Sequence, residues 1–199
     1  MMSKKIIGAA LISIGIILIM AAFALGGYNL WDDHRAQEKI DDILAQIAPH
    51  NTDYSEEAIP DYILNPYMDM PTVEIDGYQY IGTVEIPSLE LKLPIMETWS
   101  YPHMKISPCR YAGSAYLSNL VICAHNYAAH FGRLKNLQIG DKVVFTDMDG
   151  NTFHYAVEEM ETLSGTAVEE MQSGKWALTL FTCTFSGQAR VTVRCSTDE

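Results

Sequence analysis

The chain has 199 residues, of which 48% are hydrophobic and 19% are charged. This length suits one globular domain with an accessory segment and excludes a multidomain machine. Its 25 acidic residues against 13 basic ones give a net charge of -12. Because so acidic a surface repels phosphate backbones, no nucleic acid is expected as a partner.

The apolar residues are concentrated near the N-terminus, where residues 6–27 run without a charge for 22 residues. A helix needs roughly 20 apolar residues to cross a bilayer, so this run predicts a transmembrane segment. Lys4 and Lys5 precede it and two aspartates follow it closely. The positive-inside bias then predicts a single-pass topology, with the N-terminus in the cytoplasm and the rest of the chain outside. A cleaved signal peptide is the alternative, because an Ala-Phe-Ala triplet in the run has the spacing of a cleavage site.

Residues 28–71 are expected to form an extracellular stalk. Apolar residues at i, i+3, i+4 and i+7 spacing predict an amphipathic helix over residues 36–47, which would pack on the following domain. A free spacer or a dimer contact is the alternative. The stretch from Pro49 to Pro71 has no periodicity and is interpreted as an irregular linker.

The remainder of the chain has the two-residue periodicity of strands. Strands are predicted over residues 81–86, 89–93, 119–124, 142–146, 152–157, 176–183 and 190–195. An Asp149-Gly150 turn joins two of them in a hairpin. Short helices are predicted over residues 131–137 and 166–171. Many short strands with small helical inserts predict a mainly β domain, either a barrel or a sandwich.

Four cysteines, at positions 109, 123, 183 and 195, allow three pairings into two disulfides. The chain contains no C-x-x-C motif, so neither a thioredoxin-type redox centre nor a zinc ribbon is supported. A zinc site on Cys123, His125 and His130 is disfavoured because no second ligand pair accompanies them.

Cys183 ends an apolar strand, and a short loop separates it from the strand that begins at Arg190. In such a hairpin the two residues are expected to face each other. Arg194 shares the face of Arg190 but lies four residues along, about 13 Å further at the rise of a strand, so Arg190 is the better partner. A guanidinium beside a thiol favours the thiolate and donates hydrogen bonds to the oxyanion that forms when a thiolate attacks a carbonyl. The alternative is a solvated strand charge.

The sequence TLFTC at residues 179–183 matches in full the T-L-x-T-C signature of sortases, the cysteine transpeptidases of Gram-positive cell surfaces. RVTVR at residues 190–194 resembles the strand that carries their essential arginine, and NLVICAHN at residues 119–126 resembles the strand that delivers their catalytic histidine. GTVEIPSLELKLP at residues 82–94 is similar to the strands that open the domain. The resemblance covers nearly all of residues 72–195 and implies a closed eight-stranded sortase-type β-barrel.

The resemblance implies that Cys183 is the nucleophile, His125 the general acid and base, and Arg190 the group that orients the substrate and stabilises the oxyanion. Of the six histidines, only His125 ends a β-branched strand beside an asparagine. Thr182 is implied to contact the substrate, or else is a hydrogen-bonded strand hydroxyl. In the family, a surface protein with an LPxTG-like motif is cut after its threonine. The resulting thioester is captured by an amine of a peptidoglycan precursor or of a pilin lysine.

The expected organisation is a cytoplasmic tail (1–5), a transmembrane signal-anchor (6–27), a stalk helix and linker (28–71) and a sortase catalytic domain (72–199). The domain is thus expected outside the cell, anchored in the membrane. The three other cysteines are expected to be reduced and partly buried. No cofactor is expected: several glutamates between positions 158 and 170 flank a segment that forms part of a calcium site in some sortases, but a solvated acidic face is favoured.

Three alternatives stay open. A pilin-polymerising sortase is disfavoured because the linker lacks an Asp-Pro-aromatic motif, although Asn65-Pro66-Tyr67 comes close. A membrane-tethered thiol hydrolase would use the same cysteine and histidine but release its acyl group to water. A non-catalytic binding barrel would tolerate the loss of Cys183.

Overall fold

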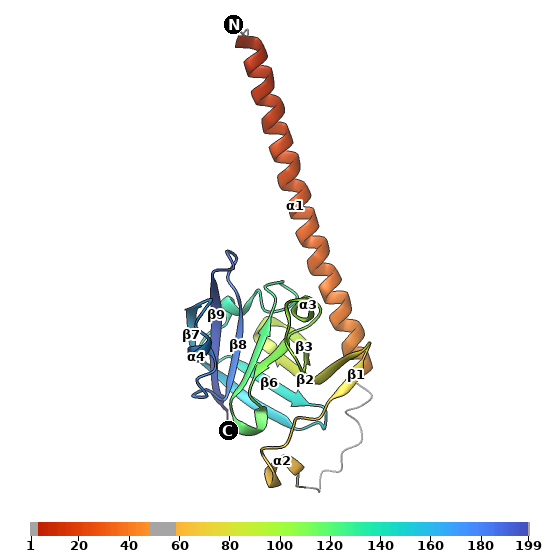
Figure 1. The fold of residues 1–199 in the computed structure, drawn as a ribbon, viewed down its shortest axis with the longest axis vertical. Coiled ribbons are helices and arrows are strands. Elements are labelled where there is room, and N and C mark those ends of the chain that lie inside the picture. Colours follow the sequence, from red (N-terminus) through yellow and green to blue (C-terminus); the bar gives the residue numbers. More distant parts are fainter. Residues whose placement is uncertain (1–3, 48–58, 199) are drawn as a thin grey trace. The chain divides into compact units, whose positions relative to one another are not determined.

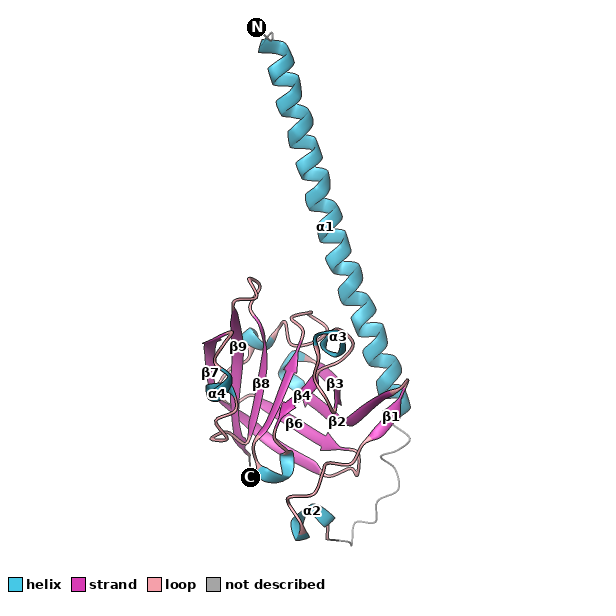
Figure 2. Cartoon of the chain, in the orientation of Figure 1, coloured by secondary structure: helices cyan, strands magenta, loops and turns pink. Residues whose placement is uncertain are grey.

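The computed structural model describes residues 4–47 and 59–198 (Figure 1). The chain divides into two compact units, residues 1–35 and residues 36–199. Helix makes up the described part of the first unit, whereas the second unit is built around β-strands (Figure 2).

The first helix, α1 (Lys4–Ile47), is 44 residues long. Among the described residues it is the one helix long and apolar enough to cross a membrane. Its large apolar side chains between residues 6 and 31 are exposed, which fits a segment that has lipid rather than protein around it. The apolar helix is therefore present as predicted, while its topology stays a prediction.

The last turns of α1 belong to the second unit and are amphipathic, as predicted. Ile40 lies in the main core cluster, and Ile43 and Ile47 lie in a second buried cluster. The helix runs without interruption from the apolar segment because no proline separates the two parts. The predicted linker falls partly on residues 48–58, outside the described residues, and continues in one helical turn, α2 (Asp61–Leu64).

Among the described residues, eight strands close into a barrel and a ninth, β1, lies at its edge. The strands are β1 (Val73–Ile75), β2 (Tyr78–Ile86), β3 (Leu91–Met96), β4 (Cys109–Ala112), β5 (Leu120–Ala124), β6 (Lys142–Asp147), β7 (Thr152–Ser164), β8 (Leu178–Cys183) and β9 (Ala189–Thr197). Their order around the barrel is β2-β3-β4-β5-β8-β9-β7-β6, and the pairing of β6 with β2 closes it. Short helical inserts include α3 (Tyr101–Met104) and α4 (Val168–Met171). The closed eight-stranded barrel is thus confirmed.

Closure depends on a change of partner along β2. The segment Tyr78–Tyr80 pairs with β1, and Gly82–Glu85 pairs with β6. At Gly82 the two backbones approach so closely that a β-carbon would lie 2.2 Å from the carbonyl oxygen of Thr146. Only glycine permits this approach.

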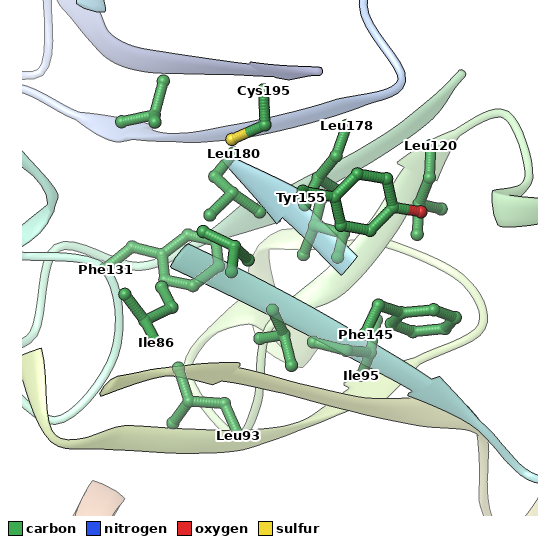
Figure 3. Close-up of a cluster of buried hydrophobic side chains, with 14 of the residues drawn as sticks. Ile86, Leu93, Ile95, Leu120, Phe131, Phe145, Tyr155, Leu178, Leu180 and Cys195 are labelled. Carbon is green, nitrogen blue, oxygen red and sulfur yellow. The ribbon is translucent and has the colours of Figure 1, made fainter. Parts of the chain in front are cut away.

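Alternate side chains of the strands fill the barrel interior (Figure 3). Leu178 and Leu180 of β8 point inward beside Tyr155 of β7, and all three are at most 2% exposed. Cys123 of β5 and Phe181 of β8 point to the outer face of the barrel and belong to the second buried cluster. The outer face of these two strands is therefore also covered. Burial on both faces explains why these two strands are almost continuously apolar in sequence.

The sequence analysis does not predict β4. This four-residue strand contacts β3 through the single pair Met96 and Cys109, and its register with β5 shifts after Arg110. Such irregular pairing leaves no alternating pattern to read.

The predicted helix over residues 131–137 is wrong. The segment forms turns and a short 3₁₀ turn, Leu134–Asn136. Phe131, Leu134 and Leu137 are all buried in the main core. Their spacing of three residues matches the period of a 3₁₀ turn, whereas an α-helix has a period of 3.6 residues.

Candidate active site

His125 and Cys183 lie at the same end of two neighbouring strands. The strands β5 and β8 are parallel, and Ala124 pairs with Thr182 at the last position of their ladder. The next residue along each segment, His125 and Cys183, therefore emerges at one level of the sheet, where strands are about 4.8 Å apart. The hydroxyl of Thr182 donates a hydrogen bond of 2.9 Å to the carbonyl oxygen of Ala124, which ties the strands together at this point.

Arg190 faces Cys183 from the next strand, as the sequence predicts. The strands β8 and β9 form an antiparallel hairpin in which these two residues are direct partners. Nη1 of Arg190 donates hydrogen bonds of 3.0 Å to the carbonyl oxygens of Gly187 and Ala189, which hold the guanidinium against the hairpin loop. Three neighbouring strands thus bring the histidine, cysteine and arginine to one end of the sheet.

Gly165 gives the guanidinium its space. A β-carbon at this position would lie 3.5 and 3.6 Å from two guanidinium nitrogens of Arg190 and 3.0 Å from the carbonyl oxygen of Gln188. The amide of Gly165 also donates a hydrogen bond of 3.0 Å to that oxygen. The segment after β7 is therefore fitted closely against the arginine.

The loop after β5 folds back on itself and orients His125. The ring of Tyr127 packs against the imidazole, with 3.9 Å between centroids and 30° between the planes, and the buried His130 packs against Tyr127 at 5.4 Å. The amide of Phe131 donates to the carbonyl oxygen of His125 at 3.3 Å, and the amide of Gly132 donates to that of Tyr127 at 2.8 Å. Because Phe131 is buried in the core, the loop is anchored at both ends.

A cavity of about 130 Å³ opens beside Cys183 and Arg190. Its wall is mostly apolar and comes from residues 99–111, from β5 and β8, and from residues 164–171. Within the wall, ring contacts connect Trp99, Tyr111 and Phe181, with centroids 5.2 to 5.3 Å apart. An apolar cavity beside a partly exposed cysteine suits an apolar side chain of a bound ligand.

The four cysteines are free, and their environments differ sharply. Burial raises the pKa of the Cys109 and Cys195 thiols to about 12, and burial also raises the pKa of Cys123. These three thiols therefore stay protonated near neutral pH and are poor nucleophiles. Cys183 is the one cysteine that is partly exposed. The other three are buried more completely than the expected partial burial, and their reduced state stays a prediction.

Thr182 points away from the cavity. Its side chain is 3% exposed, and strand alternation places it on the opposite face from Cys183. The alternative of a hydrogen-bonded strand hydroxyl matches its bond to the Ala124 carbonyl. A substrate contact at Thr182 stays a prediction, which this burial does not favour.

Among the described residues, no group of three or more His, Cys, Asp or Glu side chains is arranged to hold a metal ion. Of the glutamates considered for calcium, Glu161 forms an ion pair of 2.7 Å with Arg194. The acidic segment as it stands does not fit a calcium site, and the expectation of no cofactor stays a prediction.

The sequence analysis does not identify the cavity wall. Trp99 and Tyr101 lie between β3 and β4, in a segment fixed by Ser100, whose hydroxyl accepts a hydrogen bond of 3.1 Å from the amide of His103. The available signal is the cluster of aromatic residues in a segment without strand periodicity. A loop that exposes aromatic rings is a common binding surface.

Comparison with known proteins agrees with this arrangement. Sortase A of Bacillus anthracis is 23% identical to the chain over 179 residues, which is 85% of each protein. The structure of a Clostridium perfringens Sortase D5 transpeptidase matches with a TM-score of 0.58 at 18% identity, covering 81% of this chain and 97% of that one. The structure of Clostridium perfringens sortase C with the C-terminal cell wall sorting motif matches with a TM-score of 0.54 at 22% identity, covering 81% and 90%.

The family model named Sortase domain matches residues 84–198, more than half of the chain. The matched range contains β3 to β9 and with them the three residues brought together at the end of the sheet. The barrel, the arrangement of its strands and the sequence match agree, and the chain belongs to the sortase family.

Proposed function

We propose that this sortase is a cysteine transpeptidase that cleaves an LPxTG-like sorting signal of surface proteins and transfers the acyl part to an amine of the cell wall. The observation that carries the proposal is that His125, directly after β5, lies at the same end of the sheet as Cys183 of β8 and Arg190 of β9, and that the last two line an apolar cavity. The relative that contains a C-terminal cell wall sorting motif supports the class of donor.

In the proposed first step, the thiolate of Cys183 attacks the carbonyl carbon of the scissile peptide bond. A carbon–sulfur bond forms, the carbon–nitrogen bond breaks, and the leaving amine takes a proton from His125. Arg190, which faces Cys183 across the hairpin, donates hydrogen bonds to the oxyanion of the tetrahedral intermediate. Because its Nη1 is already held by two carbonyl oxygens, the guanidinium needs little reorganisation.

In the second step, the incoming amine attacks the thioester and gives a proton to His125. A carbon–nitrogen bond forms and the carbon–sulfur bond breaks, which regenerates the Cys183 thiolate beside a protonated His125 and leaves one amide in place of another. The acceptor is an amine of a peptidoglycan precursor or of a pilin lysine. A role in pilin polymerisation is the alternative within this same chemistry.

The membrane location is proposed from α1. The helix is long and apolar enough to cross a bilayer, and lysines precede its apolar part. We infer a single-pass anchor with the N-terminus in the cytoplasm and the barrel outside the cell, where donor proteins and wall amines are available.

The test uses the full chain in detergent micelles with a library of LPxTG-type peptides, with and without an added amine. Transpeptidation predicts a peptide–amine amide as the main product when amine is present, detected by mass spectrometry. If the added amine leaves the product unchanged as the free acid, the protein is a thiol hydrolase and the proposal is wrong. The variant Cys183→Ala is the control that shows whether any product depends on the proposed nucleophile.

A further inference from the structure

The guanidinium of Arg194 is buried and joins three elements of the barrel. The residue is 2% exposed. Its Nε donates to the carboxylate of Glu161 in β7 at 2.7 Å, and its Nη1 donates to the hydroxyl of Thr179 in β8 at 3.0 Å. Nη1 and Nη2 also donate to the backbone carbonyl oxygens of Met171 at 3.3 Å and of Glu170 at 2.8 Å. The planar guanidinium presents five N–H donors in a fixed fork, whereas a lysine ammonium has three donors on one nitrogen and cannot span all four of these acceptors.

The two backbone acceptors belong to α4, which has little stability of its own. The helix has four residues, and no side chain caps its N-terminus at Ala167. So short a helix is unstable in isolation, and the last carbonyl groups of any helix lack partners within it. Arg194 supplies hydrogen-bond donors to two of these carbonyls. A cation at the C-terminal end also interacts favourably with the backbone dipoles.

The same helix forms one wall of the cavity beside Cys183. Ala167, Val168 and Met171 line the cavity, whereas Arg194 does not. The Met171 side chain is 4% exposed and packs in the second buried cluster. The wall is therefore held by one apolar anchor and by the hydrogen bonds of Arg194.

We propose that Arg194 is a positioning residue that sets the fit of this cavity to an apolar side chain of the donor peptide. The inference rests on the proposed function, because it assigns the cavity to the donor. Arg194 acts through α4 and takes no part in bond making at Cys183. Loosening α4 therefore weakens donor binding, so the KM for the donor rises while kcat and the KM for the acceptor amine change little.

Two variants of the full chain test the inference. Arg194→Lys keeps the charge but cannot reach all four acceptors, and we expect the donor KM to rise at least tenfold with kcat within threefold of the wild type. Thr179→Val removes one acceptor and changes the side chain little, so a smaller rise of about threefold is expected. Lys142→Gln is the matched control, because it breaks the exposed ion pair of 2.6 Å with Asp198, away from the cavity, and should change neither constant.

Hydrogen exchange provides a readout that does not need catalysis. We expect the amides of residues 168–172 to exchange at least tenfold faster in Arg194→Lys, with the amides of β8 unchanged. Alkylation of Cys183 by iodoacetamide needs no cavity wall and should keep its rate constant. If Arg194→Lys does not fold, the exchange and kinetics of Thr179→Val decide the question.

Unchanged exchange together with an unchanged donor KM in the variants would overturn the inference. A fall in kcat at constant KM would also overturn it, because Arg194 would then act on the chemistry. If no peptide is ever transferred, the proposed function has failed and the link to a donor fails with it. The exchange of residues 168–172 then still shows whether Arg194 holds α4.

Discussion

Each end of the β8–β9 hairpin has one cysteine and one arginine, but the two residues are partly exposed at one end and buried at the other. At the loop end, Cys183 is paired with Arg190, and both are partly exposed beside the cavity. Towards the other end, Arg194 is paired with Thr179 and followed by Cys195, and all three are at most 2% exposed. The two ends of one hairpin therefore give an arginine different surroundings: Arg190 borders the cavity with the partly exposed Cys183, as the proposed active site requires, whereas Arg194 is buried and surrounded by hydrogen-bond acceptors.

Replacing Cys183 or Cys195 by alanine should give the largest difference in activity between the two ends of the hairpin. Cys183→Ala removes the nucleophile, and we expect transpeptidation to fall at least 10³-fold with stability nearly unchanged. Cys195→Ala should keep kcat and KM and lower the free energy of unfolding by about 1 kcal/mol, because it removes one buried sulfur. Steady-state kinetics and urea denaturation of both variants check the pair. Full activity in Cys183→Ala would refute the assignment of the site.

Removal of each arginine should separate catalysis from stability. Arg190→Ala is expected to lower kcat/KM about 10²- to 10³-fold, because a donor to the oxyanion is lost. Its free energy of unfolding should stay within about 0.5 kcal/mol of the wild type. Arg194→Ala leaves Glu161 and two carbonyl oxygens without their donor and should cost about 3–5 kcal/mol. Equal losses of stability in the two variants would contradict the comparison.

Gly165→Ala should produce a moderate effect at the loop end of the hairpin. The added β-carbon would lie in ordinary contact with the guanidinium of Arg190 at 3.5 Å but in a tight contact of 3.0 Å with the carbonyl oxygen of Gln188, in the hairpin loop that holds the guanidinium. A shift of the guanidinium by a fraction of an ångström is expected to reduce kcat about tenfold. Kinetics at saturating donor peptide measure this effect, and an unchanged kcat would contradict it.

The last and smallest expected difference is in alkylation of the thiols, which should distinguish Cys183 from the buried cysteines. Burial raises the pKa of Cys109 and Cys195 to about 12, so near pH 8 only about 10⁻⁴ of each thiol is the reactive thiolate. We expect iodoacetamide to add once per folded chain, at Cys183, as intact mass and peptide mapping would show. Two or more adducts in the native protein would mean that these thiols are not buried.

The same raised pKa values predict how stability changes with pH. In the unfolded chain the thiols lose their protons near pH 9, whereas in the folded chain Cys109 and Cys195 keep theirs up to about pH 12. The unfolded state therefore binds fewer protons between these values, and the free energy of unfolding falls as the pH rises through this window. Urea denaturation at pH 8 and pH 10 measures the slope, which a pH-independent midpoint would contradict.

Regular local patterns made much of the fold predictable. The alternation in β2, β3, β6 and β9 and the Asp149-Gly150 turn are visible in the sequence, and so is the apolar part of α1. β4 and the 3₁₀ turn at residues 134–136 were missed, because their form depends on irregular pairing and on contacts with the core. Closure through Gly82 depends on a strand 60 residues further along the chain, which local periodicity does not indicate.

The placement of the three proposed reacting residues could be predicted from the sequence, whereas the cavity could not. Cys183 and Arg190 are seven positions apart in one hairpin, so strand pairing alone brings them together. His125 required the family resemblance, since Ala124, the residue before it, pairs with Thr182, which lies 58 residues further along the chain. The cavity wall and the role of Arg194 depend on three distant segments meeting, and only the folded structure reveals that contact.

The most direct test of the proposed catalytic centre is peptide mapping of the acyl adduct. The full chain in detergent is incubated with an LPxTG-type peptide without added amine, quenched in acid, digested and analysed by mass spectrometry. The account predicts one thioester, on Cys183, that hydroxylamine removes and that is absent in Cys183→Ala. An adduct on any other residue, or efficient turnover after Cys183 has been blocked by alkylation, would contradict this prediction.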